Sequence, residues 1–154
     1  MLFRSEVLPY RVSFEALKPQ APISTGPVRA VPYLNTHLDG FRQAFGAKYS
    51  QACEAFSFLI ESGPLRIAHT ADVGGVKDLE PLLQEPLDLL VCELAHFHPE
   101  ELFARLRASR VRLVAFVHLA RPIWENLASF RQQAQAALPQ IRCLFPADGD
   151  RIEL

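Results

Sequence analysis

Four side chains that can bind a metal ion stand where short apolar runs of this chain end. They are Asp72, His96, His98 and His118. The runs that precede them cover residues 66–71, 87–93 and 111–117. Imidazole nitrogens and carboxylate oxygens are ligands that zinc and other transition metals bind in proteins. These residue types therefore point to metal chemistry, provided that the three runs end at one place.

The three runs have the length of buried strands, and the segments between them carry apolar residues at helical spacing. The predicted helices cover Gly75–Gln84, the residues after Pro99, and Ile123–Leu138. Strands that alternate with helices predict a parallel α/β segment, in which ligands bind at the carboxyl ends of the strands. We therefore expect the four side chains to meet at one edge of a sheet.

The other segments of the chain are predicted to add strands to this unit. The predicted strands are Tyr10–Leu17, Val28–Tyr33, Ala55–Glu61, Ile141–Phe145 and Arg151–Leu154, the last two joined around Asp148-Gly149. Pro32 is expected to mark a strand end or an edge, because proline has no N–H to give to a sheet. The segment Asn35–Glu54 carries His37 and is expected to be a loop with a helical piece. The aromatic side chains expected in the core are Phe56, Phe58, Phe116, Trp124 and Phe130.

The composition indicates one globular domain over residues 1–154. Hydrophobic residues make up 49% of the chain, charged residues 21%, and the formal net charge is −1. This charge, without a basic run, disfavours nucleic acid as a partner, and no apolar run approaches the ~20 residues of a membrane span. The first residues have no secretory signal pattern, and the three cysteines have no CxxC spacing. We therefore expect a cytoplasmic protein with reduced thiols.

The motifs, taken in order, resemble the second half of a metallo-β-lactamase-fold hydrolase of the phosphodiesterase and tRNA-processing branch. The segments that carry the resemblance are Thr36-His37, Ala55–Glu61, His69-Thr70-Ala71-Asp72, Leu87–Glu93, Leu113–His118 and Asp148–Leu154. The principal metal motif of the family, His-x-His-x-Asp-His, belongs to the first half and is missing. The string from His96 to Glu101 looks like it but has glutamates in place of the aspartate and the last histidine.

The resemblance implies a fold and a set of metal ligands. The implied fold is α/β, half of an αββα metallo-β-lactamase sandwich, with a mixed sheet and flanking helices. The implied ligands are His37, a bridging Asp72 and His118, and the implied ion is zinc, with manganese and iron as alternatives. His98 is our candidate proton donor to a leaving group, with His96 as the less favoured alternative, in a site that a partner completes. Supporting roles around the ligands are assigned to Glu93, His69 and His96.

The main candidates also have purely structural explanations. Asp72 precedes Val73-Gly74-Gly75, and aspartate is a good N-cap for the helix predicted there. A lone histidine that ends a buried strand, as His118 does, is often a hydrogen-bonded structural group. His37 lies in a polar loop and can be a solvated loop residue.

Two functions from different classes follow. The first is a metal-dependent hydrolase of an ester or phosphodiester, or the ligand-bearing half of one, which acts on a small molecule through a metal-activated water. The second is a catalytically inactive remnant that serves as an assembly or regulatory subunit. Half of a sandwich would leave an apolar sheet face open to water. We therefore expect a homodimer, a separate first-half subunit as partner, or a chain that is a fragment of a longer hydrolase.

Overall fold

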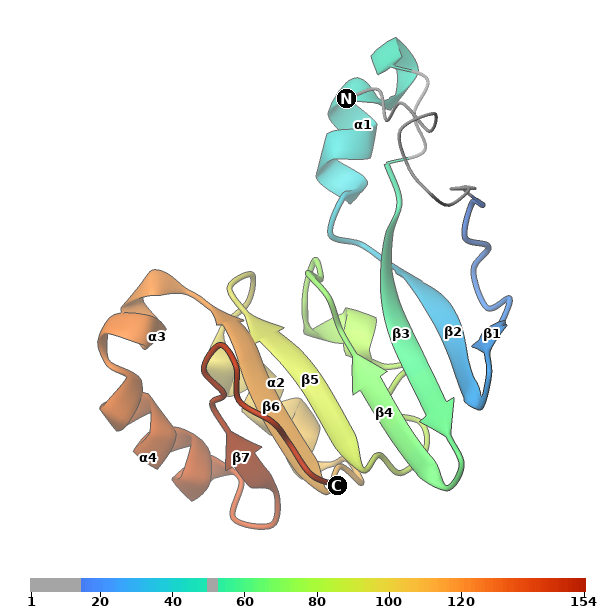
Figure 1. The fold of residues 1–154 in the computed structure, drawn as a ribbon. Coiled ribbons are helices and arrows are strands. Elements are labelled where there is room, and N and C mark those ends of the chain that lie inside the picture. Colours follow the sequence, from blue (N-terminus) through green and yellow to red (C-terminus); the bar gives the residue numbers. More distant parts are fainter. Residues whose placement is uncertain (1–14, 50–52) are drawn as a thin grey trace.

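The computed structural model describes residues 15–49 and 53–154. One seven-stranded sheet runs through them, and the order of its strands is the order of the chain (Figure 1). The strands are β1 (Ile23–Thr25), β2 (Val28–Asn35), β3 (Ala55–Ser62), β4 (Leu65–His69), β5 (Leu89–Leu94), β6 (Leu113–Leu119) and β7 (Arg142–Leu144). Neighbours from β1 to β4 are antiparallel, and neighbours from β4 to β7 are parallel. The carboxyl ends of β4, β5 and β6 therefore lie at one edge of the sheet.

The helices lie mainly on one face of this sheet (Figure 1). They are α1 (Asp39–Tyr49), the 3₁₀ helix η2 (Val76–Leu79), α2 (Pro99–Arg107), α3 (Arg121–Glu125) and α4 (Leu127–Ala137). Side chains of η2, α2 and α4 share one apolar cluster with the strands beneath them. The predicted mixed sheet with flanking helices is confirmed. In the described part of the chain, no helix combines the length and the apolar character that a membrane crossing requires.

The core is built around four phenylalanine rings. Phe116 of β6 lies with its ring centroid 5.2–6.4 Å from the rings of Phe103, Phe130 and Phe145. Phe116 and Phe130 are buried, as predicted, whereas Phe56 and Phe58 are half-buried on β3. Trp124 is 60% exposed on α3, so its assignment to the core is wrong.

The opposite face of the sheet carries a second apolar cluster. Leu89, Leu113 and Ala115 are its buried members, and Ile152 of the C-terminal segment packs against them. Figure 1 shows this segment running along β6 on this face of the sheet. The same face continues onto β1 and β2, where side chains alternate with the buried Val31. Its most exposed apolar residues there are Ile23, Val28 and Leu34, at 44%, 38% and 43%.

Two predicted helices are shorter in the structure. Instead of a helix over Gly75–Gln84, the chain forms η2 and then turns, because Pro81 has no N–H for a helical hydrogen bond. The predicted helix Ile123–Leu138 is divided at Asn126 into α3 and α4. The Asn126 side chain donates to the carbonyl of Pro122, and such local bonds compete with helical geometry.

The predicted terminal hairpin does not form. β7 pairs with β6 in parallel, and residues 151–154 belong to no strand. Pro146 follows β7 after a single residue, and the Asp150 carboxylate accepts the N–H of Ala147 and closes a turn. Pro32 lies inside β2 beyond the end of its pairing with β1, so the prediction of an edge is confirmed. Most of the predicted strand Tyr10–Leu17 falls outside the described residues, and its last three residues are not in a strand.

Candidate metal centre

The loop that carries His37 is attached to the sheet by a buried polar network. Asn35, the last residue of β2, accepts the N–H of His37 at 3.0 Å and donates to the Ser57 hydroxyl at 3.1 Å. The Ser57 hydroxyl donates to the carbonyl of Thr70 at 2.6 Å. Both Asn35 and Ser57 are buried, so these bonds are shielded from water. The network therefore joins the loop after β2 to the loop after β4, which carries Asp72.

The backbone turns sharply before Asp72. Ala71 has a φ of 50°, a left-handed conformation that costs about 1–3 kcal/mol in a residue other than glycine. The His69 ring supports this turn, because its Nδ1 accepts the N–H of Ala71 at 2.9 Å. Asp72 does not cap the following helix: the N-cap position of η2 is Gly75, and no side chain bonds there. The N-cap explanation of Asp72 therefore does not apply.

Asp78 fastens the two loops to each other. One oxygen of its carboxylate, Oδ2, accepts the N–H and the hydroxyl of Thr36 at 3.1 and 2.9 Å and the N–H of Gly74 at 2.8 Å. Gly74 lies against Thr36 so closely that a Cβ there would be 2.8 Å from the Thr36 carbonyl carbon and oxygen. Thr36 precedes His37, and Gly74 follows Asp72 by two residues. The seam between Thr36, Gly74 and Asp78 therefore sets the distance between His37 and Asp72.

Replacing Gly74 by alanine is expected to push these loops apart. The added methyl group would overlap the backbone of Thr36, and a backbone cannot move aside by a simple side-chain rotation. We expect metal affinity, measured by competition with a chromophoric chelator, to fall about 10- to 100-fold, as for other positions that orient ligands. Gly75→Ala is the matched control, because a Cβ at Gly75 meets nothing within 4 Å. Equal affinity in the two variants would contradict the role of the seam.

Glu93 holds the ring of His96 in place. Its carboxylate is 1% exposed at the end of β5 and accepts the backbone N–H groups of Val73, Ala95 and His96. The same carboxylate lies 2.9 Å from His96 Nδ1. Since a carboxylate accepts, Nδ1 carries the proton and Nε2 keeps its lone pair for a metal. This is the arrangement in which metal-binding histidines are usually supported.

His118 is brought to the site by a β-bulge. Glu93 pairs with Val117 and Leu94 with Leu119, so His118 is the extra residue of β6, with a φ of 45°. Bulges of this kind redirect a side chain beside functional sites. The ring of His118 is half exposed, and its Nε2 lies 3.8 Å from Asp72 Oδ1.

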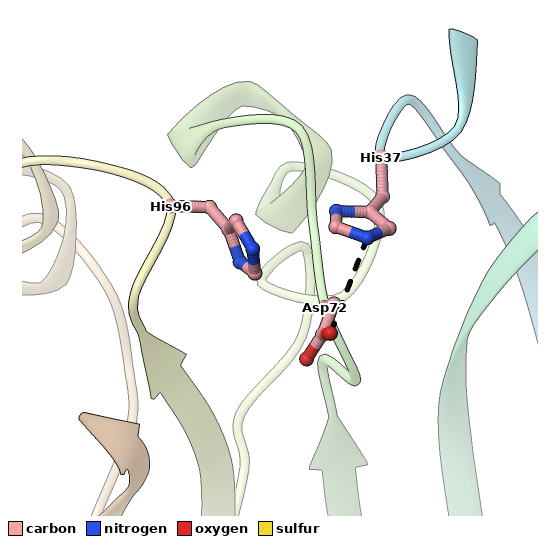
Figure 2. A group of neighbouring side chains, drawn as sticks. All are labelled: His37, Asp72 and His96. Atoms are coloured by element: carbon pink, nitrogen blue, oxygen red, sulfur yellow. Dashed lines mark ion pairs between the residues drawn. The ribbon is translucent and has the colours of Figure 1, made fainter. Parts of the chain in front are cut away.

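Three of these side chains form a compact group of possible ligands (Figure 2). One ligand atom each of His37, Asp72 and His96 can be chosen so that all lie within 4.8 Å of one another. His37 Nε2 lies 4.0 Å from Asp72 Oδ2, while the other carboxylate oxygen faces His118. Two ligands of one ion, each bound at about 2.0–2.2 Å, lie at most about 4.4 Å apart. The donor set and its spacing therefore fit an ion after small side-chain rotations.

His118, His69 and His98 surround this group, and His118 is near enough for its ring to approach that of His96. The His96 ring centroid is 4.7 Å from that of His37 and 5.6 Å from that of His118. The His69 ring accepts the N–H of Ala71, the residue before Asp72, and does not belong to the compact group. His98 is exposed at the start of α2 and lines a hollow of about 440 Å³ together with His96. The structure thus brings together His37, Asp72, His96 and His118 and leaves His98 beside them.

No cysteine belongs to this group in the part of the chain that the structure describes. Cys92 is fully buried in β5, and burial, followed by the charge of Glu93, raises the pKa of its thiol far above the ordinary value. Partial burial also raises the pKa of the Cys143 thiol. Both thiols therefore stay protonated near neutral pH, whereas metals bind thiolates.

Comparison with known proteins relates this arrangement to solved structures. No protein-family model matches the chain, and no curated protein matches its sequence. The metallo-β-lactamase fold protein YhfI from Bacillus subtilis superposes with a TM-score of 0.68 at 17% identity, over 96% of this chain and 59% of that one. The chain has the metallo-β-lactamase fold.

Two further structures with this fold class have hydrolase descriptions. A proposed metal-dependent hydrolase from Parabacteroides distasonis superposes with a TM-score of 0.62 at 9% identity, over 86% of this chain and 57% of that one. The isothiocyanate hydrolase from Delia radicum gut bacteria gives 0.60 at 14% identity, over 88% and 58%. The chain therefore spans less than two thirds of the length of each structure. At such identities the likeness establishes the metallo-β-lactamase fold, while function must be argued from the site.

The sequence predicts most, but not all, of the residues that gather at this edge of the metallo-β-lactamase fold. It placed His96 in a supporting role, although His96 belongs to the compact group. Glu93, to which the sequence assigns a supporting role around the ligands, contacts the His96 ring, and this contact indicates that His96 is itself a ligand. Asp78 and Asn35 were missed, because each acts through a partner that is distant in the chain.

Proposed function

We propose that this chain is a metal-dependent hydrolase, or the ligand-bearing part of one. His37, Asp72 and His96 would hold the ion, and His118, which faces the other carboxylate oxygen of Asp72, would be a further ligand. The convergence of these side chains from four separate loops and strand ends carries the proposal. The hydrolase descriptions of structures with the same fold support it as an analogy.

The residues of the chain have distinct tasks in this proposal. When bound, the ion supplies Lewis-acid chemistry, which acidifies water and polarises an ester carbonyl or a phosphoryl group. Glu93 keeps the proton on Nδ1 of His96. The Asp72 carboxylate, which lies between His37 and His118, offsets the positive charge of the ion. His98, beside His96 in the same hollow, is assigned the transfer of a proton to the leaving group. Zinc is the expected ion, with manganese and iron as alternatives.

Metal content of the purified protein tests this proposal first. We expect about one or more zinc, manganese or iron ions per chain by mass spectrometry, and hydrolysis of an ester or phosphodiester by the loaded protein. Protein that stays metal-free after incubation with each ion would overturn the proposal of a metal-dependent hydrolase. A metal-loaded protein without activity on either substrate class would instead favour the assembly or regulatory subunit.

We also propose that the chain works with a partner, either a second copy or a separate subunit that supplies the rest of the fold. The exposed Ile23, Val28 and Leu34 on the face of the second apolar cluster support this, because such patches usually mark interfaces. Light scattering should give a mass above 17.3 kDa for the chain alone if it pairs with itself. A monomer that also fails to bind such a subunit would contradict this part of the proposal.

The cytoplasm is the proposed setting of the protein, and its three free cysteines are consistent with a reducing compartment.

A further inference from the structure

A groove of about 590 Å³ lies beside the candidate metal centre. Its walls come from the end of β6, from α3 and from the segment after β7. The residues that line it are Phe116, Val117, His118, Leu119, Trp124, Pro146, Ala147 and Asp148. Figure 1 shows α3 beyond the end of β6 at which the site residues gather. The groove therefore opens at the functional edge of the sheet.

His118 belongs to both the groove and the metal centre. The bulge at the end of β6 turns its ring so that Nε2 lies 3.8 Å from Asp72 Oδ1, while the same residue lines the groove. A molecule seated in the groove would therefore have one end within reach of the ligand cluster.

The side chains that line the groove favour apolar, uncharged molecules over anions. Apart from His118 and Asp148, its side chains are apolar or aromatic, and Trp124 presents an indole that is 60% exposed. An exposed indole at a concave surface is a favourable platform for flat apolar groups. Asp148 is the acidic residue of this lining, and no lysine or arginine belongs to it. The local charge therefore disfavours an anion.

We propose that this groove binds the aromatic or other flat apolar part of an uncharged substrate, with the scissile bond at the metal centre. The use of the groove in substrate selection rests on the proposed hydrolase function. Binding of an apolar molecule does not, because it needs neither a metal nor a reaction.

The single tryptophan of the chain provides the measurement. The indole N–H resonance of Trp124 is followed by NMR while metal-free protein is titrated with acetanilide, a neutral aromatic amide. We expect a saturable shift with a dissociation constant in the millimolar range, which is usual for so small a ligand. Phenylacetate, an anion of similar size, should bind at least about fivefold more weakly because of Asp148.

Two variants separate groove binding from non-specific contact. Ala147→Glu places a charged side chain in the groove and leaves Trp124 intact, and it should weaken acetanilide binding at least about fivefold. Ala136→Glu, on an exposed position of α4 outside the groove, should leave it unchanged. Absence of saturation, equal binding in Ala147→Glu, or equal binding of phenylacetate would overturn the proposal.

The outcome is independent of the test for metal. If the metal-free protein binds acetanilide in the groove but holds no ion, the hydrolase fails and the binding site stands. If the protein is an active esterase, Ala147→Glu should raise KM for phenyl acetate and leave KM for methyl acetate unchanged. Equal effects on both esters would show that the groove does not select the substrate.

Discussion

Replacing Asp72 by alanine is expected to abolish metal binding by this chain. Its two carboxylate oxygens face His37 Nε2 at 4.0 Å and His118 Nε2 at 3.8 Å, so the side chain stands between both halves of the ligand cluster. Without it, the proposed ligands are imidazoles alone, and the carboxylate charge in direct contact with the cation is lost. We expect less than a tenth of the wild-type metal content after dialysis, measured by mass spectrometry.

The controls for this variant are chosen by position. Glu61→Ala removes a half-buried carboxylate on β3, where it pairs with Arg29 and Arg66, and should leave the metal content unchanged. A double variant, Asp72→Ala with His118→Ala, should bind no more metal than Asp72→Ala alone. Full metal retention in Asp72→Ala would remove Asp72 from the ligand set and leave His37, His96 and His118 as its proposed members.

The part of the site that the sequence predicts depends on strands with simple local patterns. The runs that become β4, β5 and β6 are apolar and end on polar residues, and parallel pairing brings those ends together. This was enough to predict that Asp72, His96 and His118 lie at one edge. It was also enough to predict the parallel part of the sheet, because the pattern places helices between those strands; the mixed sheet as a whole was implied by the family resemblance.

The details that set the geometry depend on contacts between distant residues. Thr36 and Asp78 are 42 positions apart, and nothing in either segment alone shows that they bond. The bulge at His118 arises from a mismatch in the pairing of β5 with β6, which a pattern of alternating residues does not reveal. Trp124 was predicted in the core by its size, but the break at Asn126 leaves α3 at the surface. The site therefore gains its shape from tertiary contacts after local structure is set.

Glu93 offers the sharpest test of how far the buried polar groups hold this edge together. Each of its known partners is a donor: the N–H groups of Val73, Ala95 and His96, and Nδ1–H of His96. Glu93→Gln keeps the size of the side chain but turns an amide NH₂ toward donors. It should therefore destabilise the metal-free protein by about 2–4 kcal/mol, measured by urea unfolding.

The matched variant Glu61→Gln alters a carboxylate that is 35% exposed and pairs with the exposed Arg29, and it should change stability by less than about 1 kcal/mol. Glu93→Gln should also lower metal affinity more than its effect on folding explains, because the His96 ring loses the acceptor that fixes its tautomer. Equal stability of Glu93→Gln and the wild type would mean that water replaces the carboxylate at these donors. In that case the orientation of His96 would depend on its ring contacts with His37 and His118 rather than on Glu93.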